Sequence, residues 1–331
     1  MKTNKLGYSL WLDFVERDFL NHHFTAMIER ETINGATSNP SIFANALNTS
    51  PAYAEQLKSL SNLSPKDKYE ALAIEDIRNA AIRLRGAYDA GNEGYISIEV
   101  DPFLSDDAEA TLIEARRLFE AIGEPNVMIK IPATDAGYIV MNKLLSDGIS
   151  VNATLVFSPQ QAKKCLKAMK SGIDEFDNTG GERVEAVISV FVSRFDRMLD
   201  QELAAKGLPT AQTGIMNAAQ IYHMVEKNHT PSIQTLFAST GVKGDDLAAD
   251  YYVRRLCAPH AINTVPLDTL KASIGTEMPT DSQLPSMEDI EDYFSTLQAS
   301  DIDMQAIYST LLDDGIKAFK EAFGTMLSNL E

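Results

Sequence analysis

A single lysine, Lys130, lies inside an otherwise apolar run over residues 127–134 (VMIKIPAT). Short apolar runs that end at a breaker are typical of buried strands in a parallel sheet. Pro132 cannot donate to a sheet ladder, so the strand should end there, with Lys130 near its carboxyl end. Burial favours the neutral amine, which can attack a carbonyl and form a Schiff base. The alternative is a strand-end lysine whose charge reaches water.

Other predicted strands also end in polar side chains. The carboxyl ends of barrel strands meet at one face, and active sites gather there. We therefore expect one cavity to collect an amine, two carboxylates, two further cations and several hydroxyls and amides. These residues are Asp13, Thr37, Asn39, Glu99, Lys130, Asn152, Thr154, Ser189, Arg194, Ser239 and Lys243.

This set of residue types fits catalysis through a Schiff base. The amine would attack a ketone, and an acid–base group would move the proton that breaks or forms a C–C bond. A second carboxylate with a hydroxyl could hold the water that leaves or enters at the carbinolamine. Nearby cations would bind a substrate phosphate and favour the neutral amine.

Each residue also has a purely structural interpretation. Asp13 and Glu99 could cap strands or form ion pairs. Asn39 begins a common turn and cap sequence, and Arg194 could be a helix-surface charge. The histidines lack a metal-binding spacing such as H-E-x-x-H, and no G-x-S-x-G segment is present. We therefore expect neither a metal site nor a Ser/His/Asp triad.

The chain alternates predicted strands and helices over about 260 residues. We predict strands over residues 9–15, 95–100, 127–132, 149–157, 184–193, 235–240 and 261–266. The segment 36–42 holds a further strand, short and polar, with a helix opening after Pro40. Helix start signals lie between them, including caps at Ser64 and Ser105 and a capping box at Ser158 and Gln161. This alternation predicts an α/β fold, a (β/α)8 TIM-type barrel. A doubly wound sheet would also alternate, but no Gly-x-Gly-x-x-Gly follows any strand.

The pattern changes at about residue 276. From there on only helical periodicity remains, over residues 287–297 and 304–330. We interpret residues 276–331 as a helical extension packed on the barrel, so that 1–331 forms a single domain. We expect the extension to cover part of the barrel mouth.

The composition restricts the partners of the protein. Its 331 residues include 29 Lys plus Arg and 47 Asp plus Glu, a net charge of -18. Such a surface repels nucleic acid and anionic membranes, and an anionic substrate would need a local cluster of cations. No segment approaches the ~18 apolar residues of a membrane span, and the first residues lack a signal-peptide pattern. Cys165 and Cys257 lack ligand spacing, so we expect reduced thiols in a cytoplasmic protein.

Several segments, in this order along the chain, resemble motifs of the transaldolase family. Residues 36–42 (ATSNPSI) resemble its T-x-N-P-S segment, and residues 127–134 resemble the strand that holds its Schiff-base lysine. Similar matches are residues 98–101 (IEVD) with Ser105 beyond, 151–158 (VNATLVFS) and 188–194 (ISVFVSR). Residues 238–243 (ASTGVK) look like the longer bacterial branch, and the resemblance runs from about residue 10 to the C-terminus.

The resemblance implies a cofactor-independent transferase of the non-oxidative pentose phosphate pathway. A dihydroxyacetone unit would pass from sedoheptulose 7-phosphate to glyceraldehyde 3-phosphate, giving erythrose 4-phosphate and fructose 6-phosphate. Matched by motif, Lys130 would be the nucleophile and Asp13 the acid–base group for C–C cleavage. Glu99 and Thr154 would position the catalytic water. The family fold is a barrel with the lysine on its fourth strand, which agrees with the strand order predicted above.

The resemblance also implies a set of substrate-binding residues. These are Asn39 and Asn152 for substrate hydroxyls, Thr37 and Ser97 for the pocket lining, and Ser189, Arg194 and Ser239 for the phosphate. One position departs from the family pattern. Many transaldolases have an arginine two residues after the equivalent of Ser239, where this chain has Gly241. Lys243 would then supply the second charge, as a point charge and not as a bidentate fork.

Two other functions stay open. A class I aldolase that releases free dihydroxyacetone or its phosphate would use the same lysine. It would differ in whether water or an aldehyde acceptor intercepts the intermediate. An inactive barrel that only binds sugar phosphates would be favoured by a substituted lysine, but Lys130, Asp13 and Glu99 are all present. The phosphorylated ketose and aldose are the expected partners, and either a monomer or a homodimer fits the sequence.

Overall fold

The computed structural model describes residues 6–181, 183–228, 230–274 and 276–331. Eight parallel strands form a closed barrel, in which each strand pairs with the next and β8 pairs with β1. The strands are β1 (Ser9–Asp13), β2 (Gly35–Thr37), β3 (Ile96–Glu99), β4 (Val127–Pro132), β5 (Val151–Val156), β6 (Ala186–Phe191), β7 (Ile233–Ala238) and β8 (Ala261–Pro266). The predicted (β/α)8 barrel is thereby confirmed, with Lys130 on the fourth strand.

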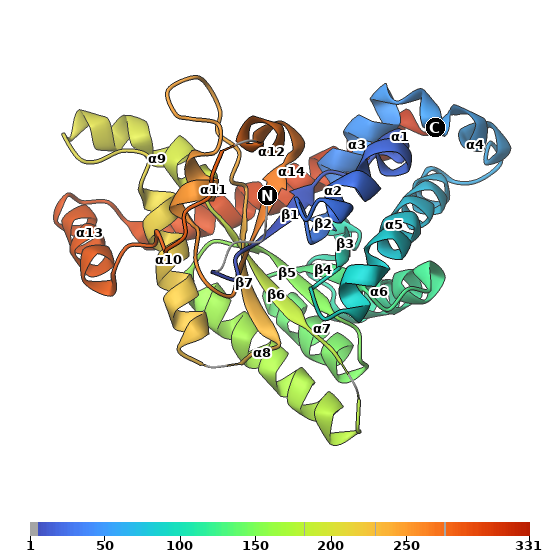
Figure 1. The fold of residues 1–331 in the computed structure, drawn as a ribbon, viewed down its shortest axis with the longest axis horizontal. Helices are drawn as coiled ribbons and strands as arrows, with labels where there is room; N and C mark the ends of the chain where they lie inside the picture. Colours follow the sequence, from blue (N-terminus) through green and yellow to red (C-terminus); the bar gives the residue numbers. More distant parts are fainter. Residues whose placement is uncertain (1–5, 182, 229, 275) are drawn as a thin grey trace.

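Helices connect the strands and surround the barrel (Figure 1). They are α1 (Arg17–Phe19), the π-helical η1 (Leu20–Phe24), α2 (Thr25–Glu29), α3 (Pro40–Thr49), η2 (Pro51–Tyr53), α4 (Ala54–Ser59), α5 (Pro65–Asp89), η3 (Pro102–Leu104), α6 (Ala108–Ile122), α7 (Asp135–Ser146), α8 (Pro159–Asn178), α9 (Ser193–Ala205), α10 (Thr213–Glu226), α11 (Tyr251–Arg255), α12 (Leu267–Ser273), α13 (Met287–Ala299) and α14 (Met304–Asn329).

Two of the three helix caps predicted from the sequence are present. Ser64 caps α5, and Ser158 and Gln161 form the predicted capping box of α8. The predicted cap at Ser105 is wrong, because Asp107 accepts the hydrogen bond from the Ala110 amide and caps α6. The reason is that η3 extends the preceding turn, so that the Ser105 amide bonds back to the carbonyl of Pro102.

The interior of the barrel is filled by apolar side chains beneath a polar layer. The apolar layer includes Trp11, Met128, Val187, Leu236 and Ile262, all buried in one cluster. Side chains two residues apart on a strand share a face, so the next layer towards the carboxyl ends holds Asp13, Lys130, Ser189, Ala238 and Thr264. Gly35 makes room for this packing, because a Cβ there would lie 2.6 Å from the Trp11 ring. The apolar layer therefore forms the floor of any cavity at that end.

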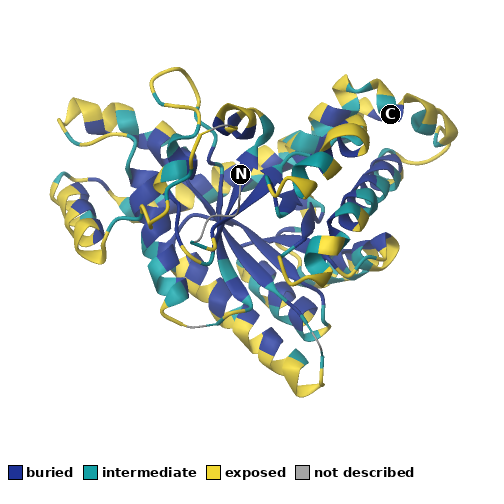
Figure 2. Cartoon of the chain, viewed as in Figure 1, coloured by how far each residue is buried: buried dark blue, intermediate teal, exposed yellow. Residues whose placement is uncertain are grey.

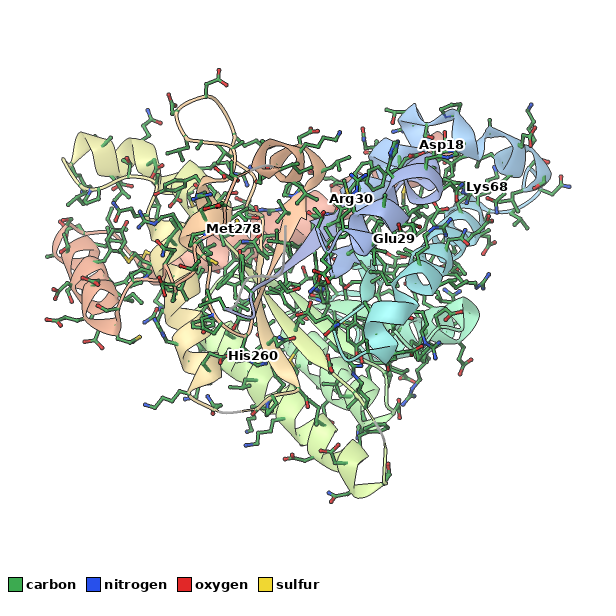
Figure 3. The ribbon with its side chains drawn as sticks, viewed as in Figure 1. Asp18, Glu29, Arg30, Lys68, His260 and Met278 are labelled. Carbon is green, nitrogen blue, oxygen red and sulfur yellow. The ribbon has the colours of Figure 1, made fainter. Side chains whose placement is uncertain are left out.

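The last two helices pack on the barrel. Helix α13 contacts α10, and α14 contacts α3, α5, η3 and β5. Figure 1 shows α14 running across the molecule from the side of α13 to the end of the chain. Lys68, labelled in Figure 3, donates to the carbonyl of Leu330 at 2.7 Å and ties that end to α5. Helix α14 thus contacts β5 and the elements α3 and η3, which follow β2 and β3 at their carboxyl ends.

Burial follows the layers of the barrel. Figure 2 shows the strands buried along their length, while the surrounding helices expose their outer faces. Both cysteines are buried thiols. Within the described ranges, no helix has the length and hydropathy that crossing a bilayer requires.

Candidate active site

A cavity of about 410 Å³ lies at the carboxyl ends of the strands. Helix α14 forms part of its wall through Phe319. Of the residues expected there from the sequence, those on the cavity wall are Asp13, Thr37, Asn39, Lys130, Thr154, Ser189, Arg194, Ser239 and Lys243. The strands and the loops that follow them thus collect amine, carboxylate, hydroxyl and guanidinium groups in one place.

Lys130 lies at the base of this cavity and is only 6% exposed. Its Nζ donates to the carbonyl of Ser38 at 3.0 Å and lies 3.6 Å from Oε2 of Glu99. The sheet register explains the second contact, because Glu99 on β3 is the direct partner of Lys130 on β4. Neighbouring parallel strands therefore hold an amine and a carboxylate side by side in a buried setting.

Glu99 is buried behind Lys130 and does not itself line the cavity. Burial raises the pKa of its carboxyl to about 7, although the Lys130 ammonium lowers it in part. Among the described residues, neither Oε2 of Glu99 nor Oγ1 of the buried Thr154 has a hydrogen-bond partner. Buried polar atoms are normally hydrogen-bonded, so each of these oxygens can accept a hydrogen bond from a water or from a substrate hydroxyl. A carboxyl with this pKa exchanges its proton near neutral pH.

Asp13 lines the same cavity as Lys130 and interacts with its charge. It accepts a hydrogen bond from Oγ1 of Thr37 at 2.7 Å, and that hydroxyl also lies 2.6 Å from Oγ1 of Thr264. Burial raises the pKa of Asp13, and the charge of Lys130 and the Thr37 hydroxyl act in the opposite direction. Two carboxyl groups of raised pKa therefore surround one amine, an arrangement suited to proton transfer.

Two further predicted residues, Ser97 and Asn152, lie beneath the cavity wall. The Asn152 amide donates from Nδ2 to Oγ of Ser97 at 3.0 Å and accepts at Oδ1 from Ser189 at 2.6 Å. Of these three side chains only Ser189 reaches the cavity. The network fixes the orientation of the Asn152 amide, because each end of it has one defined partner.

The far end of the cavity is positively charged. Arg194 and Arg197, both on α9, line it, and the Arg194 guanidinium lies 5.1 Å from the centre of the Phe191 ring. Burial lowers the pKa of both arginines, and each lacks an ion pair with any described carboxylate. Oγ of Ser193 and Oγ of Ser239 lie 3.1 Å apart at the same end.

Some cavity residues were not identified from the sequence. The polar ones are Ser41, Ser193, Arg197, Thr264, Asp268 and Thr269. A signal existed for two of them. Thr264 is an inward position of β8 by strand alternation, and Arg197 follows Arg194 at helical spacing. Which face of α9 meets the cavity, however, is decided by packing and not by the spacing.

Lys243 lines the cavity from the loop after β7 and is exposed to solvent. Gly241, at the position where the family often has an arginine, also lines it. Within the described ranges, no group of three or more His, Cys, Asp or Glu side chains is arranged to hold a metal ion.

Comparison with known proteins agrees with this geometry. The model of the family described as "Transaldolase/Fructose-6-phosphate aldolase" matches residues 10–330. A transaldolase of Campylobacter jejuni subsp. doylei is 44% identical over 334 residues, covering 98% of this chain and 99% of that protein. A transaldolase of Helicobacter pylori (strain HPAG1) is 42% identical over 324 residues, covering 97% and 99%. The chain therefore belongs to the transaldolase/fructose-6-phosphate aldolase family.

Proposed function

We propose that this chain is a transaldolase of the non-oxidative pentose phosphate pathway. It transfers a dihydroxyacetone unit from sedoheptulose 7-phosphate to glyceraldehyde 3-phosphate, through a Schiff base on Lys130 and without a cofactor. The observation that carries the proposal is the buried Lys130 amine, 3.6 Å from the Glu99 carboxyl and on the wall of a cavity that ends in two arginines.

The first half of the reaction forms the Schiff base. The neutral Lys130 amine attacks the ketone carbon, and loss of water from the carbinolamine gives the iminium. Glu99, with a pKa of about 7, and the hydroxyl of Thr154 hold this water and pass protons to it. Asp13 then takes the proton of the C4 hydroxyl as the C3–C4 bond breaks, so an aldose leaves and a three-carbon enamine stays on the lysine.

The second half reverses these steps with a new aldehyde. The enamine carbon attacks the aldehyde carbon of the acceptor, and Asp13 returns its proton to the new hydroxyl. Water then hydrolyses the iminium and frees Lys130. No electrons are gained or lost overall, in keeping with a reaction that needs no cofactor.

The remaining cavity residues would hold the sugar chain. Oδ1 of Asn39 accepts from the Ile42 amide at 3.0 Å, which turns the Nδ2 donor of the same side chain towards a substrate hydroxyl. We assign the lining and the hydroxyl and phosphate contacts to Thr37, Ser189, Arg194, Ser239 and Lys243. Ser97 and Asn152 would act from beneath the wall, through the hydrogen bond between Asn152 and Ser189. Guanidinium groups suit phosphate because they bind it in a bidentate manner.

The proposal extends to the organisation of the chain. We infer one domain over residues 1–331, because α14 contacts elements from the first half of the barrel and contributes Phe319 to the cavity. The buried thiols fit a cytoplasmic location. The net charge of -18 fits sugar phosphates as partners, and not nucleic acid or membrane. We infer a monomer or a homodimer.

The test is borohydride trapping with fructose 6-phosphate, followed by peptide mass mapping. We expect a three-carbon adduct on Lys130 in the wild type and none in Lys130→Met, since only a primary amine forms the imine. An acceptor aldehyde added before the borohydride should discharge the adduct. Slow loss to water alone would identify an aldolase, the other activity in the family description. No adduct on any lysine of folded protein would contradict the Schiff-base mechanism.

A further inference from the structure

Arg197 is a second arginine at the far end of the cavity. It lies three residues after Arg194 on α9, and residues three apart on a helix are neighbours on its surface. Both side chains line the cavity, and Arg197 lowers the pKa of Arg194 by charge repulsion. Two positive charges are thus held close together at the end of the cavity opposite to the floor.

These two arginines differ from most others in the chain, because they form no ion pair with a carboxylate of the described residues. Arginines elsewhere form ion pairs with carboxylates, among them Arg17, Arg85, Arg116, Arg117, Arg183 and Arg254. Asp314 on α14 attracts Arg194 but forms no ion pair with it. The chain has a net charge of -18, yet no described carboxylate forms an ion pair with these two adjacent cations. The pair is therefore suited to an anionic ligand.

The groups around the two arginines favour the same kind of ligand. No side chain caps the N-terminus of α9, where the helix dipole and amide groups attract anions. The hydroxyls of Ser193 and Ser239 lie next to it, 3.1 Å apart. Ser239 holds a left-handed backbone conformation, with φ at 55°, at the end of β7. Hydroxyls, helix amides and guanidinium groups together are typical of a site for a phosphate monoester.

We propose that Arg197 is a specificity-determining residue that binds the substrate phosphate together with Arg194. It thereby supplies the second guanidinium that the family pattern would place at Gly241. This inference rests on the proposed function, because the phosphate is that of the ketose and aldose substrates. The guanidinium offers five donors in a planar fork, whereas the exposed Lys243 offers a flexible point charge. Arg197, more than Lys243, should select phosphorylated sugars over neutral ones.

The experiment compares Arg197→Met with Lys243→Met and with a control arginine. Arg30, labelled in Figure 3, directly follows α2, is exposed and is not among the residues that line the cavity, so Arg30→Met removes the same group elsewhere. For Arg197→Met we expect KM for fructose 6-phosphate to rise about tenfold, the worth of one charged hydrogen-bond contact, with kcat nearly unchanged. Inhibition by inorganic phosphate should weaken in the same ratio, and Arg197→Lys should recover part of both losses.

A neutral ketone separates phosphate recognition from catalysis. Borohydride trapping of unphosphorylated dihydroxyacetone should be equal in the wild type and in Arg197→Met, because that ketone has no phosphate to lose contact with. A KM for Arg197→Met that matches Arg30→Met, or a larger rise in Lys243→Met, would overturn the role of Arg197.

If the proposed Schiff-base function is wrong, the wild type itself would form no adduct with either ketone. Calorimetric titration of inorganic phosphate into the wild type and Arg197→Met would still test the site, because weaker binding in the variant supports it and equal binding refutes it.

Discussion

Each end of the barrel has a hollow and, on or beneath its wall, a glutamate of raised pKa, yet only one end is arranged for chemistry. The hollow at the amino ends of the strands is the larger, about 680 Å³ against about 410 Å³. Glu29 and His260, labelled in Figure 3, both line it. Its charged groups are largely paired, as Arg183 with Glu185 at 2.8 Å and His260 with Glu226 at 2.9 Å. Size alone would therefore select the wrong end.

Glu93 and Glu99 show the difference most clearly, because they flank the same strand, β3. Burial raises the pKa of both. Oε2 of Glu93 accepts hydrogen bonds from Oγ of Ser9 and Nε1 of Trp11, so it holds the base of the barrel together. Oε2 of Glu99 has no such donor among the described residues and faces the Lys130 amine instead. A satisfied carboxylate is structural, whereas an unsatisfied one beside an amine can transfer protons.

The largest effect should come from Glu99→Gln. The amide cannot transfer a proton, so we expect kcat for the transaldolase reaction to fall about 10²–10⁴-fold. Steady-state kinetics with fructose 6-phosphate and erythrose 4-phosphate would measure it. Unchanged kcat would mean that Glu99 is as structural as Glu93 and would remove the distinction between the two ends.

At high pH, the same Glu99→Gln substitution should raise the free energy of unfolding relative to the wild type. The pKa of Glu99 is about 7 in the folded protein against an ordinary value of 4.5, so the folded state binds this proton more tightly. The stability it contributes is complete below about pH 4.5 and is lost as the pH rises through about 7, a change of about 3 kcal/mol. Urea unfolding at pH 5 and pH 8 should show Glu99→Gln gaining relative to the wild type. An equal difference at both pH values would refute the raised pKa.

Glu93→Ala should affect stability and not catalysis. It leaves the Ser9 hydroxyl and the Trp11 indole N–H without their acceptor, which should lower the free energy of unfolding by about 1–3 kcal/mol. Urea unfolding would measure the loss, and kcat per folded molecule should stay the same. Glu29→Ala is the control, since Glu29 lines the same hollow but is exposed. A loss of kcat in Glu93→Ala would make this end of the barrel functional.

The smallest effect should come from Gly315→Ala in α14, which tests how closely that helix covers the phosphate end. The added Cβ would lie 3.0 Å from Leu155 Cδ2, which must give way, and 3.4 Å from a guanidinium nitrogen of Arg194, so the new methyl limits the room of the arginine. We expect KM for fructose 6-phosphate to rise, with kcat unchanged. The rise should be smaller than the roughly tenfold increase expected for loss of a whole charged contact.

Gly324→Ala in the same helix is the matched control. Its Cβ would meet only Phe103 Cζ, at 3.8 Å, so KM should not change while stability rises by up to about 1 kcal/mol. Equal KM values in the two variants would show that α14 does not constrain Arg194.

Much of the fold could be predicted because its signals are local. Apolar runs or apolar–polar alternation located the strands other than the short, polar β2, and β4 and β8 have the predicted bounds. Asn39 caps α3, which begins at Pro40, where a helix was predicted to open, and β2 ends at Thr37. One predicted helix cap was wrong because two local signals compete. Asp107 takes the capping role expected of Ser105, because a 3-10 turn intervenes.

The sequence by itself determined the barrel, the strand that bears Lys130 and the residue types at the strand ends, because strand alternation and breaker positions are properties of short segments. Tertiary structure alone decided which polar side chains meet. Register placed Glu99 beside Lys130, and the depth of packing left Glu99, Ser97 and Asn152 beneath the cavity wall. The rotation of α9 about its axis brought Arg197 to the cavity, because packing of its apolar face orients a helix and spacing alone does not.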